Sequence, residues 1–143
     1  MSHGRLLSIV ASVVVAATLV AAITVMDTPA QQREQRVDAR RVDDLQNIGN
    51  AVDAYHARNG ALPADIGVIV SQPGWNLAAA DPVDGQPYAY EILGERSYRL
   101  CASFATDTAD GGQASLVIDA WKHGAGRQCF KREAPPLPSA TPR

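Results

Sequence analysis

Few residues in this chain have the types and spacing that a reactive site requires. The histidines are His3, His56 and His123. His123 and Cys129 stand six residues apart, whereas a zinc site needs three or four ligands at suitable spacing. The chain contains no CxxC, HExxH or CxxCH motif. We therefore expect no metal at His123 and interpret this segment as a turn built on Gly124 and Gly126.

The motifs of nucleophilic and phosphate chemistry are also missing from the sequence. Ser103 and Ser115 lack the flanking glycines of a nucleophile elbow. Gly124-x-Gly126 precedes an expected strand, so no helix N-terminus stands there to bind phosphate. The net charge of −2 provides no basic field for nucleic acid. We therefore expect a protein that is not an enzyme, has no cofactor and binds no nucleic acid.

Two carboxylates, Asp107 and Asp110, are the weak candidates for a calcium loop, because glycines follow them. An EF-hand loop needs more side-chain oxygens at fixed spacing and a closing glutamate, which this segment lacks. The pattern favours an ordinary hairpin turn. Asp81 and Asp84, beside Pro82 and Gly85, likewise favour turns in which each carboxylate accepts hydrogen bonds from its own backbone.

The cysteines, Cys101 and Cys129, both follow the apolar N-terminal segment. In an oxidising compartment an even pair indicates one disulfide, whereas in a cytosol it indicates two buried thiols. An exported domain favours the disulfide. It would join the second strand to the last one and add about 3–4 kcal/mol of stability in the chain-entropy model.

The segment Leu6–Met26 contains no charge, proline or glycine. As a helix it is about 30 Å long, which matches the hydrocarbon core of a bilayer. It exceeds the roughly 7–15 apolar residues of a cleaved signal peptide. We therefore predict a flank at 1–5, a retained transmembrane anchor at 6–26, an extracytoplasmic domain at 27–133 and a disordered proline-rich tail at 134–143.

The charges that follow the anchor give opposing indications of orientation. The arginines Arg33, Arg36, Arg40 and Arg41 favour a cytoplasmic domain by the positive-inside rule. Asp27 is the first charge after the span, however, acids alternate with the arginines, and long C-terminal domains translocate largely regardless of charge. The same acids favour a solvated helix face over contact between these arginines and anionic lipid headgroups. Together with the cysteine pair, this places the domain outside the cytoplasm.

The pattern of the domain predicts an α+β fold. Apolar residues at spacings of three and four predict an amphipathic helix over 36–59, with His56 on its polar side and Gly60 as its stop. We also expect a short helical turn at residues 64–70. Period-two alternation predicts a hairpin of Tyr88–Leu93 and Ser97–Phe104, followed by a strand at Ala114–Trp121 and a short one at Gln128–Lys131. The architecture is thus a long N-terminal helix, half transmembrane and half amphipathic, packed on a small antiparallel sheet of three or four strands.

Two segments carry a family resemblance. Ala54–Pro63 reads AYHARNGALP, and Asp81–Tyr90 reads DPVDGQPYAY. Together they resemble the type IV pilin-like proteins, most closely the major pseudopilin of type II secretion. The resemblance spans roughly residues 36–105 and implies a pilin-like fold on the exported side. It also implies a calcium site in the C-terminal loops, for which Asp107 and Asp110 are the candidates.

The N-terminus departs from the pattern of the family. Processed members carry a glutamate at the fifth position after the cleavage-site glycine, and here Ile9 occupies that position after Gly4. We therefore expect a pilin-like domain on an uncleaved anchor.

The sequence as a whole predicts a non-enzymatic, single-pass protein of the inner (cytoplasmic) membrane with a periplasmic domain. It would act by contact with the bilayer and with other membrane or pilin-like proteins, such as a secretion or pilus apparatus. One alternative is an accessory single-span subunit of a larger membrane complex, such as an electron-transfer assembly. Another is a small periplasmic ligand-binding or enzymatic domain.

Overall fold

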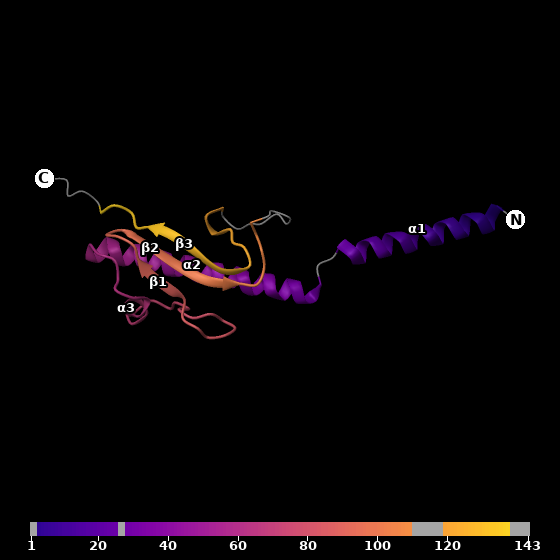
Figure 1. Ribbon diagram of the computed structural model, residues 1–143. Helices are drawn as coiled ribbons and strands as arrows, with labels where there is room; N and C mark the ends of the chain where they lie inside the picture. Colours follow the sequence, from indigo (N-terminus) through magenta and orange to yellow (C-terminus); the bar gives the residue numbers. More distant parts are fainter. Residues whose placement is uncertain (1–2, 26–27, 110–118, 138–143) are drawn as a thin grey trace. The chain divides into compact units, whose positions relative to one another are not determined.

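The computed structural model describes residues 3–25, 28–109 and 119–137 (Figure 1). The chain divides into two compact units, Met1–Arg33 and Glu34–Arg143. Each unit is described by itself below.

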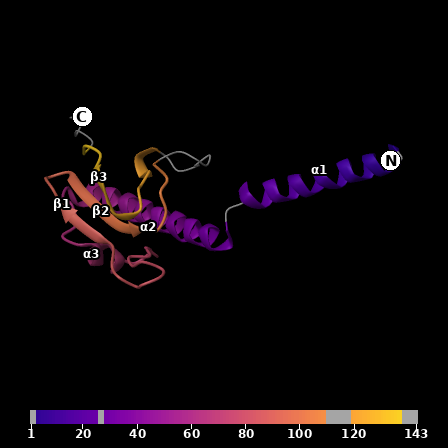
Figure 2. The ribbon, with the colours of Figure 1, turned by 45° about the vertical axis from the view of Figure 1, so that its right-hand side comes forward.

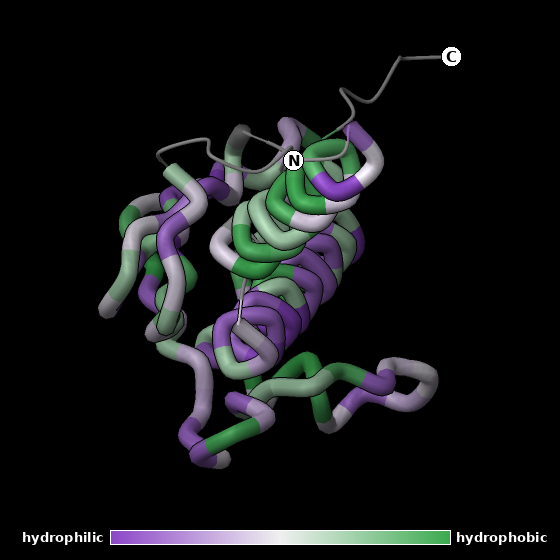
Figure 3. Tube along the Cα trace, turned by 90° about the vertical axis from the view of Figure 1, so that its right-hand side faces the viewer, coloured by the Kyte–Doolittle hydropathy of each residue, from purple (hydrophilic) through white to green (hydrophobic). Residues whose placement is uncertain are grey.

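The first unit is dominated by helix α1, His3–Val25. Its large apolar side chains between Leu6 and Ile23 are more than half exposed, with values from 53% to 72%. In Figure 3 the turns of α1 are mostly green or pale, the colours of apolar and neutral residues. The element is thus a helix with no apolar core of its own, as expected of a segment that another solvent must cover.

Helix α2, Pro29–Asn59, begins with a local hydrogen-bonding signature. The side-chain oxygen of Gln31 accepts from the backbone N–H of Thr28, and the Thr28 hydroxyl accepts from the backbone N–H of Gln31. This reciprocal pair is a capping box, and Pro29 occupies the first helical position, where its missing N–H costs nothing. The capping box therefore marks the start of a new helix at Pro29.

The amphipathic stripe predicted for α2 is confirmed within the second unit. Leu45, Ile48 and Val52 are fully buried, and Val42 is nearly so. The helix ends at Asn59, and Gly60 follows with φ of 75°, its N–H donating to the carbonyl of His56 at 2.8 Å. A residue with positive φ at this position suits glycine, as predicted.

A three-stranded antiparallel sheet packs on α2, in the order β1-β2-β3 (Figure 2). Its strands are β1 Ala89–Ile92, β2 Ser97–Phe104 and β3 Gly126–Glu133. Leu100 pairs with Tyr90 on one side and with Phe130 on the other. The side chains of Tyr98, Leu100, Ala102 and Phe104 are buried, which confirms the alternation predicted for this strand.

The prediction of a strand at Ala114–Trp121 is wrong for its last three residues, which are the part of it that the structure describes. Asp119–Trp121 forms a 3-10 helix, η1, and residues 114–118 lie outside the described residues. Trp121 is 3% exposed because its ring packs against Phe130 at 4.9 Å and under the guanidinium of Arg132. We predicted a short fourth strand at Gln128–Lys131. In the structure this segment belongs to β3, which is longer than predicted.

The short helix α3, Ile66–Val70, confirms the helical turn predicted at 64–70. The carboxylate of Asp65 caps it by accepting from the N–H of Val68 at 3.1 Å. Ile66 and Ile69 join the core.

The folded domain extends further toward the C-terminus than predicted. Ala134, the first residue of the expected tail, is fully buried, and its N–H donates to the carbonyl of Arg96 at 2.8 Å. Leu137 approaches Gly60. Residues 138–143 lie outside the described part of the chain.

Candidate functional site

The candidate anchor is α1, which is long and apolar enough to cross a membrane. None of the residues in its most apolar stretch is buried within the protein. Such a helix at the N-terminus is also compatible with a signal sequence, so length and composition alone do not define its fate.

The side-chain hydroxyls of α1 all find acceptors within the helix itself. Ser8 donates to the carbonyl of Gly4 at 3.0 Å, and Ser12 donates to that of Ser8 at 2.9 Å. Thr18 lies 2.8 Å from the carbonyl of Val15, and Thr24 donates to that of Ala21 at 2.9 Å. Because hydrocarbon offers no hydrogen-bond partners, this internal pairing lets the helix enter lipid without stranding a hydroxyl.

In the second unit, a buried cluster of charges links α2 to two loops. Arg41 donates from Nε to Asp81 Oδ2 at 2.6 Å and from Nη2 to Asp81 Oδ1 at 3.1 Å, and its Nη1 donates to Asp38 at 2.8 Å. Asp38 Oδ2 also accepts from the N–H and the hydroxyl of Thr106, both at 2.7 Å. Arg41, Asp38 and Asp81 are each at most 9% exposed. The cluster therefore holds the Asp81 loop and the end of β2 against the helix.

The hydrogen bonds inside this cluster determine the charge states of Arg41 and Asp81. Burial acts to raise the pKa of Asp81, but the hydrogen bonds from Arg41 and from the backbone N–H groups of Val83 and Asp84 outweigh it, so the pKa lies below its ordinary value. The hydrogen bond to Asp81 is the main reason that the pKa of Arg41 is raised. The charges are thus those of a salt bridge at neutral pH.

Tyrosine hydroxyls attach the sheet to the helix at further points. Tyr88 donates to Asp44 at 2.9 Å, and Tyr98 lies 2.9 Å from Asp53 Oδ1. Burial raises the pKa of both phenols, and the neighbouring carboxylates add to the effect. Tyr90 donates to the carbonyl of Pro63 at 3.0 Å, and burial raises its pKa to about 12. These are structural contacts, because each hydroxyl already has a partner.

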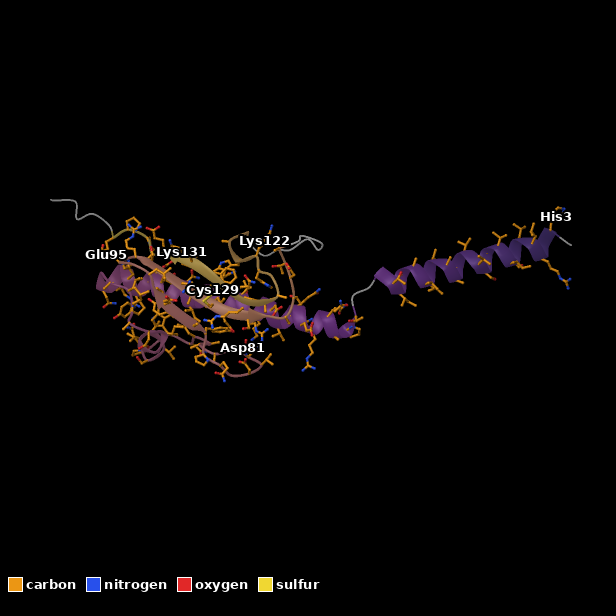
Figure 4. The ribbon with its side chains drawn as sticks, viewed as in Figure 1. His3, Asp81, Glu95, Lys122, Cys129 and Lys131 are labelled. Atoms are coloured by element: carbon orange, nitrogen blue, oxygen red, sulfur yellow. A yellow bond between two sulfur atoms is a disulfide. The ribbon has the colours of Figure 1, made fainter. Side chains whose placement is uncertain are left out.

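Cys101 and Cys129 form the predicted disulfide. They are directly opposite each other on β2 and β3, with a Cα–Cα distance of 4.1 Å. Cys101 is 5% exposed, whereas Cys129, labelled near Lys131 in Figure 4, is exposed. The bond therefore joins the central strand to an edge strand, as the sequence indicated.

A hollow of about 210 Å³ lies beside this bond, between the Asp81 loop and the sheet. Asp84, Gln86, Ser103 and Arg127 are among its lining residues. The pairing predicted for Asp81 and Asp84 is confirmed there, because Asp81 accepts from the N–H of Val83 at 2.8 Å and Asp84 from that of Gln86 at 2.9 Å. Carboxylates committed to loop structure leave no pair in position for acid–base work.

The calcium candidates are only partly described. Asp107 is exposed, and its Oδ1 accepts from the N–H of Ala109 at 2.7 Å, as in an ordinary turn. Asp110 lies outside the described residues. No group of three or more metal-binding side chains occurs among residues 3–25, 28–109 and 119–137.

The histidines that chemistry first pointed to are packing residues. His123 is 3% exposed and stacks on Phe104, with ring centroids 3.8 Å apart, while its backbone bonds to Thr108. The turn predicted beside it is present, with Gly126 at φ of 92°.

The placement of His56 on the polar side of α2 is wrong, because the side chain is 2% exposed. The hairpin residues Glu95 and Arg96 and the tail residues Pro136 and Leu137 surround it. With His56, they line a cavity of about 420 Å³. Helical spacing in fact places His56 on the buried face, four residues after Val52, and the prediction failed because it assigned the side by the polarity of histidine.

Sequence reasoning missed the Asp38–Arg41–Asp81 cluster and the capping box at Thr28. A local signal existed for each. Asp38 and Arg41 stand three residues apart on a helix, and Thr28-x-x-Gln31 has the spacing of a capping box. The partner Asp81 gave no such signal, because it lies 40 residues from Arg41.

Comparison of the chain with protein-family models, with curated proteins and with solved structures finds no match. The resemblance to pilin-like proteins therefore stays a prediction.

Proposed function

We propose that this chain is a non-enzymatic, membrane-anchored envelope protein of pilin-like type that acts by protein–protein contact, with its domain on the extracytoplasmic side of the inner membrane. The proposal rests on two features found together. One is an apolar helix whose hydroxyls are hydrogen-bonded within the helix, and the other is a small domain that contains a disulfide between two of its strands. An oxidised cysteine pair favours an exported domain, since cytosolic thiols are kept reduced.

The contacts of the two segments that resemble pilin-like proteins support the proposed resemblance. Tyr90 of the second segment donates to the carbonyl of Pro63 in the first, and Asp81 of the second segment is bound by Arg41, which lies in α2 before the first segment. Residues of the two motifs thus make contacts that join the helix, the loop and the hairpin. A motif present by chance would not be expected to make such contacts.

The surface of α1 favours one alternative, an accessory single-span subunit. Ala11, Ser12 and Ala16 place small side chains on one face of this helix, beside Val15 and Leu19. Small residues let a second membrane helix approach closely. The helix could therefore pack in a larger membrane complex.

The deciding experiment is isolation of the full chain from native membranes in mild detergent, with identification of the co-purifying proteins by mass spectrometry. We expect components of a secretion or pilus apparatus. The matched control is a variant with Ala11, Ser12 and Ala16 changed to leucine. Loss of an unrelated, stoichiometric membrane complex in this control would favour the accessory-subunit alternative, and a chain that stays in the aqueous fraction without detergent would refute both.

A further inference from the structure

The exposed arginines at the start of α2 form one face of that helix. Arg33, Arg36 and Arg40 are separated by three and four residues, so at about 100° per residue they lie within roughly 60° of one another. All three are exposed. The buried side of the helix, marked by Arg41, Leu45 and Ile48, lies next to this face, about 60° to 120° around the helix from Arg33.

These arginines lack acidic partners in the part of the chain that the structure describes. The ion pairs there join Arg41 to Asp38 and Asp81, Arg96 to Glu133, and Arg99 to Glu91. None of them involves Arg33, Arg36 or Arg40.

The acids that alternate with the arginines in sequence do not neutralise this face. Asp38 is turned into the domain, where Arg41 and Thr106 occupy its carboxylate. Asp44 is buried and accepts from Tyr88. Glu34 lies about 100° around the helix from Arg33, and only Asp43, three residues after Arg40, borders the face. The sequence alone favoured a solvated face because acids alternate with the arginines along the chain.

The length of the connecting chain sets an upper limit on the distance between each arginine and the end of the anchor. Three peptide units and one to three helical turns separate the three arginines from Met26. Their Cα atoms therefore lie at most about 17 to 27 Å from it. Arginine side chains add several ångströms of reach, and electrostatic attraction extends over about 8 Å at physiological salt. Guanidinium groups bind phosphate in a bidentate manner.

We propose that Arg33, Arg36 and Arg40 bind the phosphate-bearing headgroups of anionic phospholipids next to the anchor. This inference rests on the proposed membrane anchor. It adds a lipid preference that the anchor does not imply, because an apolar helix enters zwitterionic and anionic bilayers alike.

The test uses the full chain in a neutral detergent and follows the arginine side-chain N–H signals by NMR. Short-chain phosphatidylglycerol, short-chain phosphatidylcholine and inorganic phosphate are titrated separately. We expect saturable shifts of Arg33, Arg36 and Arg40 with phosphatidylglycerol alone, weakened when salt is raised. Equal shifts with phosphatidylcholine would overturn the inference, and so would equal shifts with phosphate, which would assign the arginines to a soluble anion.

Matched variants give a second measurement. In the triple variant R33Q/R36Q/R40Q, we expect retention of fluorescent phosphatidylglycerol to weaken at least about tenfold, since each arginine near an anionic surface adds about fivefold. The charge-matched control R58Q/R127Q/K131Q should retain the lipid. Equal retention by both variants would refute the inference. If the wild-type chain needs detergent but shows no lipid preference, only the arginine inference fails; if it needs no detergent, the anchor itself fails.

Discussion

In α1 each hydroxyl donates to a carbonyl three or four residues earlier, whereas the domain connects its buried polar groups over long distances in the chain. Tyr90 reaches Pro63 across 27 residues, and Thr106 reaches Asp38 across 68. A helix covered by lipid must satisfy itself locally, because its surroundings offer no partner. A domain in water can bury a charge only where the fold brings a partner to it. The predictions below test this contrast.

The largest effect is expected when Arg41 is removed from the buried cluster. Arg41→Ala leaves Asp38 and Asp81 buried without their cation, which should lower the free energy of unfolding by about 3–5 kcal/mol. The matched control is Arg40→Ala, an exposed neighbour, for which we expect a change within about 0.5 kcal/mol. Urea denaturation of both variants measures the difference. Equal stabilities would show that the cluster does not hold the loops to α2.

The disulfide should contribute next. Replacing both cysteines with alanine opens a loop with a sequence separation of 28, which in the chain-entropy model costs about 3–4 kcal/mol. Denaturation of the double variant, beside oxidised and reduced wild type, measures the loss. Two reactive thiols in protein isolated from its native envelope would contradict the oxidised state.

A charge placed in α1 tests whether this helix lies in lipid. Val14→Arg puts a cation near the middle of the anchor, at a cost to insertion of about 2.5–3.5 kcal/mol. We expect part of the protein to move from the membrane fraction to the soluble fraction, whereas Val14→Leu should remain in the membrane. Unchanged partitioning of the arginine variant would mean that α1 does not lie across lipid.

Gly60 tests a backbone requirement that belongs to the domain alone. With φ of 75° at this position, Gly60→Val should destabilise the domain by about 1–2 kcal/mol, because a β-branched residue resists the left-handed region. Gly60→Asn is the milder control, since asparagine tolerates this conformation. Thermal unfolding by circular dichroism compares the variants, and equal melting temperatures would argue against the proposed helix stop.

The smallest effects are expected from pH. The pKa of Asp81 is lowered in the folded state, so its contribution is present above about pH 4 and is lost as the pH falls below that. The pKa of Tyr90 is raised to about 12, so its contribution is present below about pH 10 and is lost between there and pH 12. Melting temperatures across both ranges should fall at each end. Tyr90→Phe should reduce the alkaline fall, and an unchanged fall would remove Tyr90 from this account.

The sequence predicted those features that depend on neighbours along the chain. The stripe of Val42, Leu45 and Ile48 follows from helical spacing, and the alternation from Tyr98 to Phe104 follows from the period of a strand. The disulfide followed from the parity of the cysteines and the presence of an anchor.

The features that failed depend on distant contacts. His56 is the exception: its spacing from Leu45 and Val52 places it on the buried face, and the prediction put it on the polar side because histidine is polar. Asp119–Trp121 continued an apolar run but forms a 3-10 helix, with Trp121 packed against Phe130 and Arg132. The Asp38–Arg41–Asp81 cluster needs a residue from a remote loop, which no local pattern identifies.

The position of the disulfide also limits how the sheet can misassemble. If β3 shifted by one residue along β2, Phe130 would turn from the core to water and Lys131 would turn inward. Such a shift moves Cys129 away from Cys101, so the covalent bond forbids it once formed. The bond thereby keeps the register of β2 and β3 even when heat loosens the packing around the sheet.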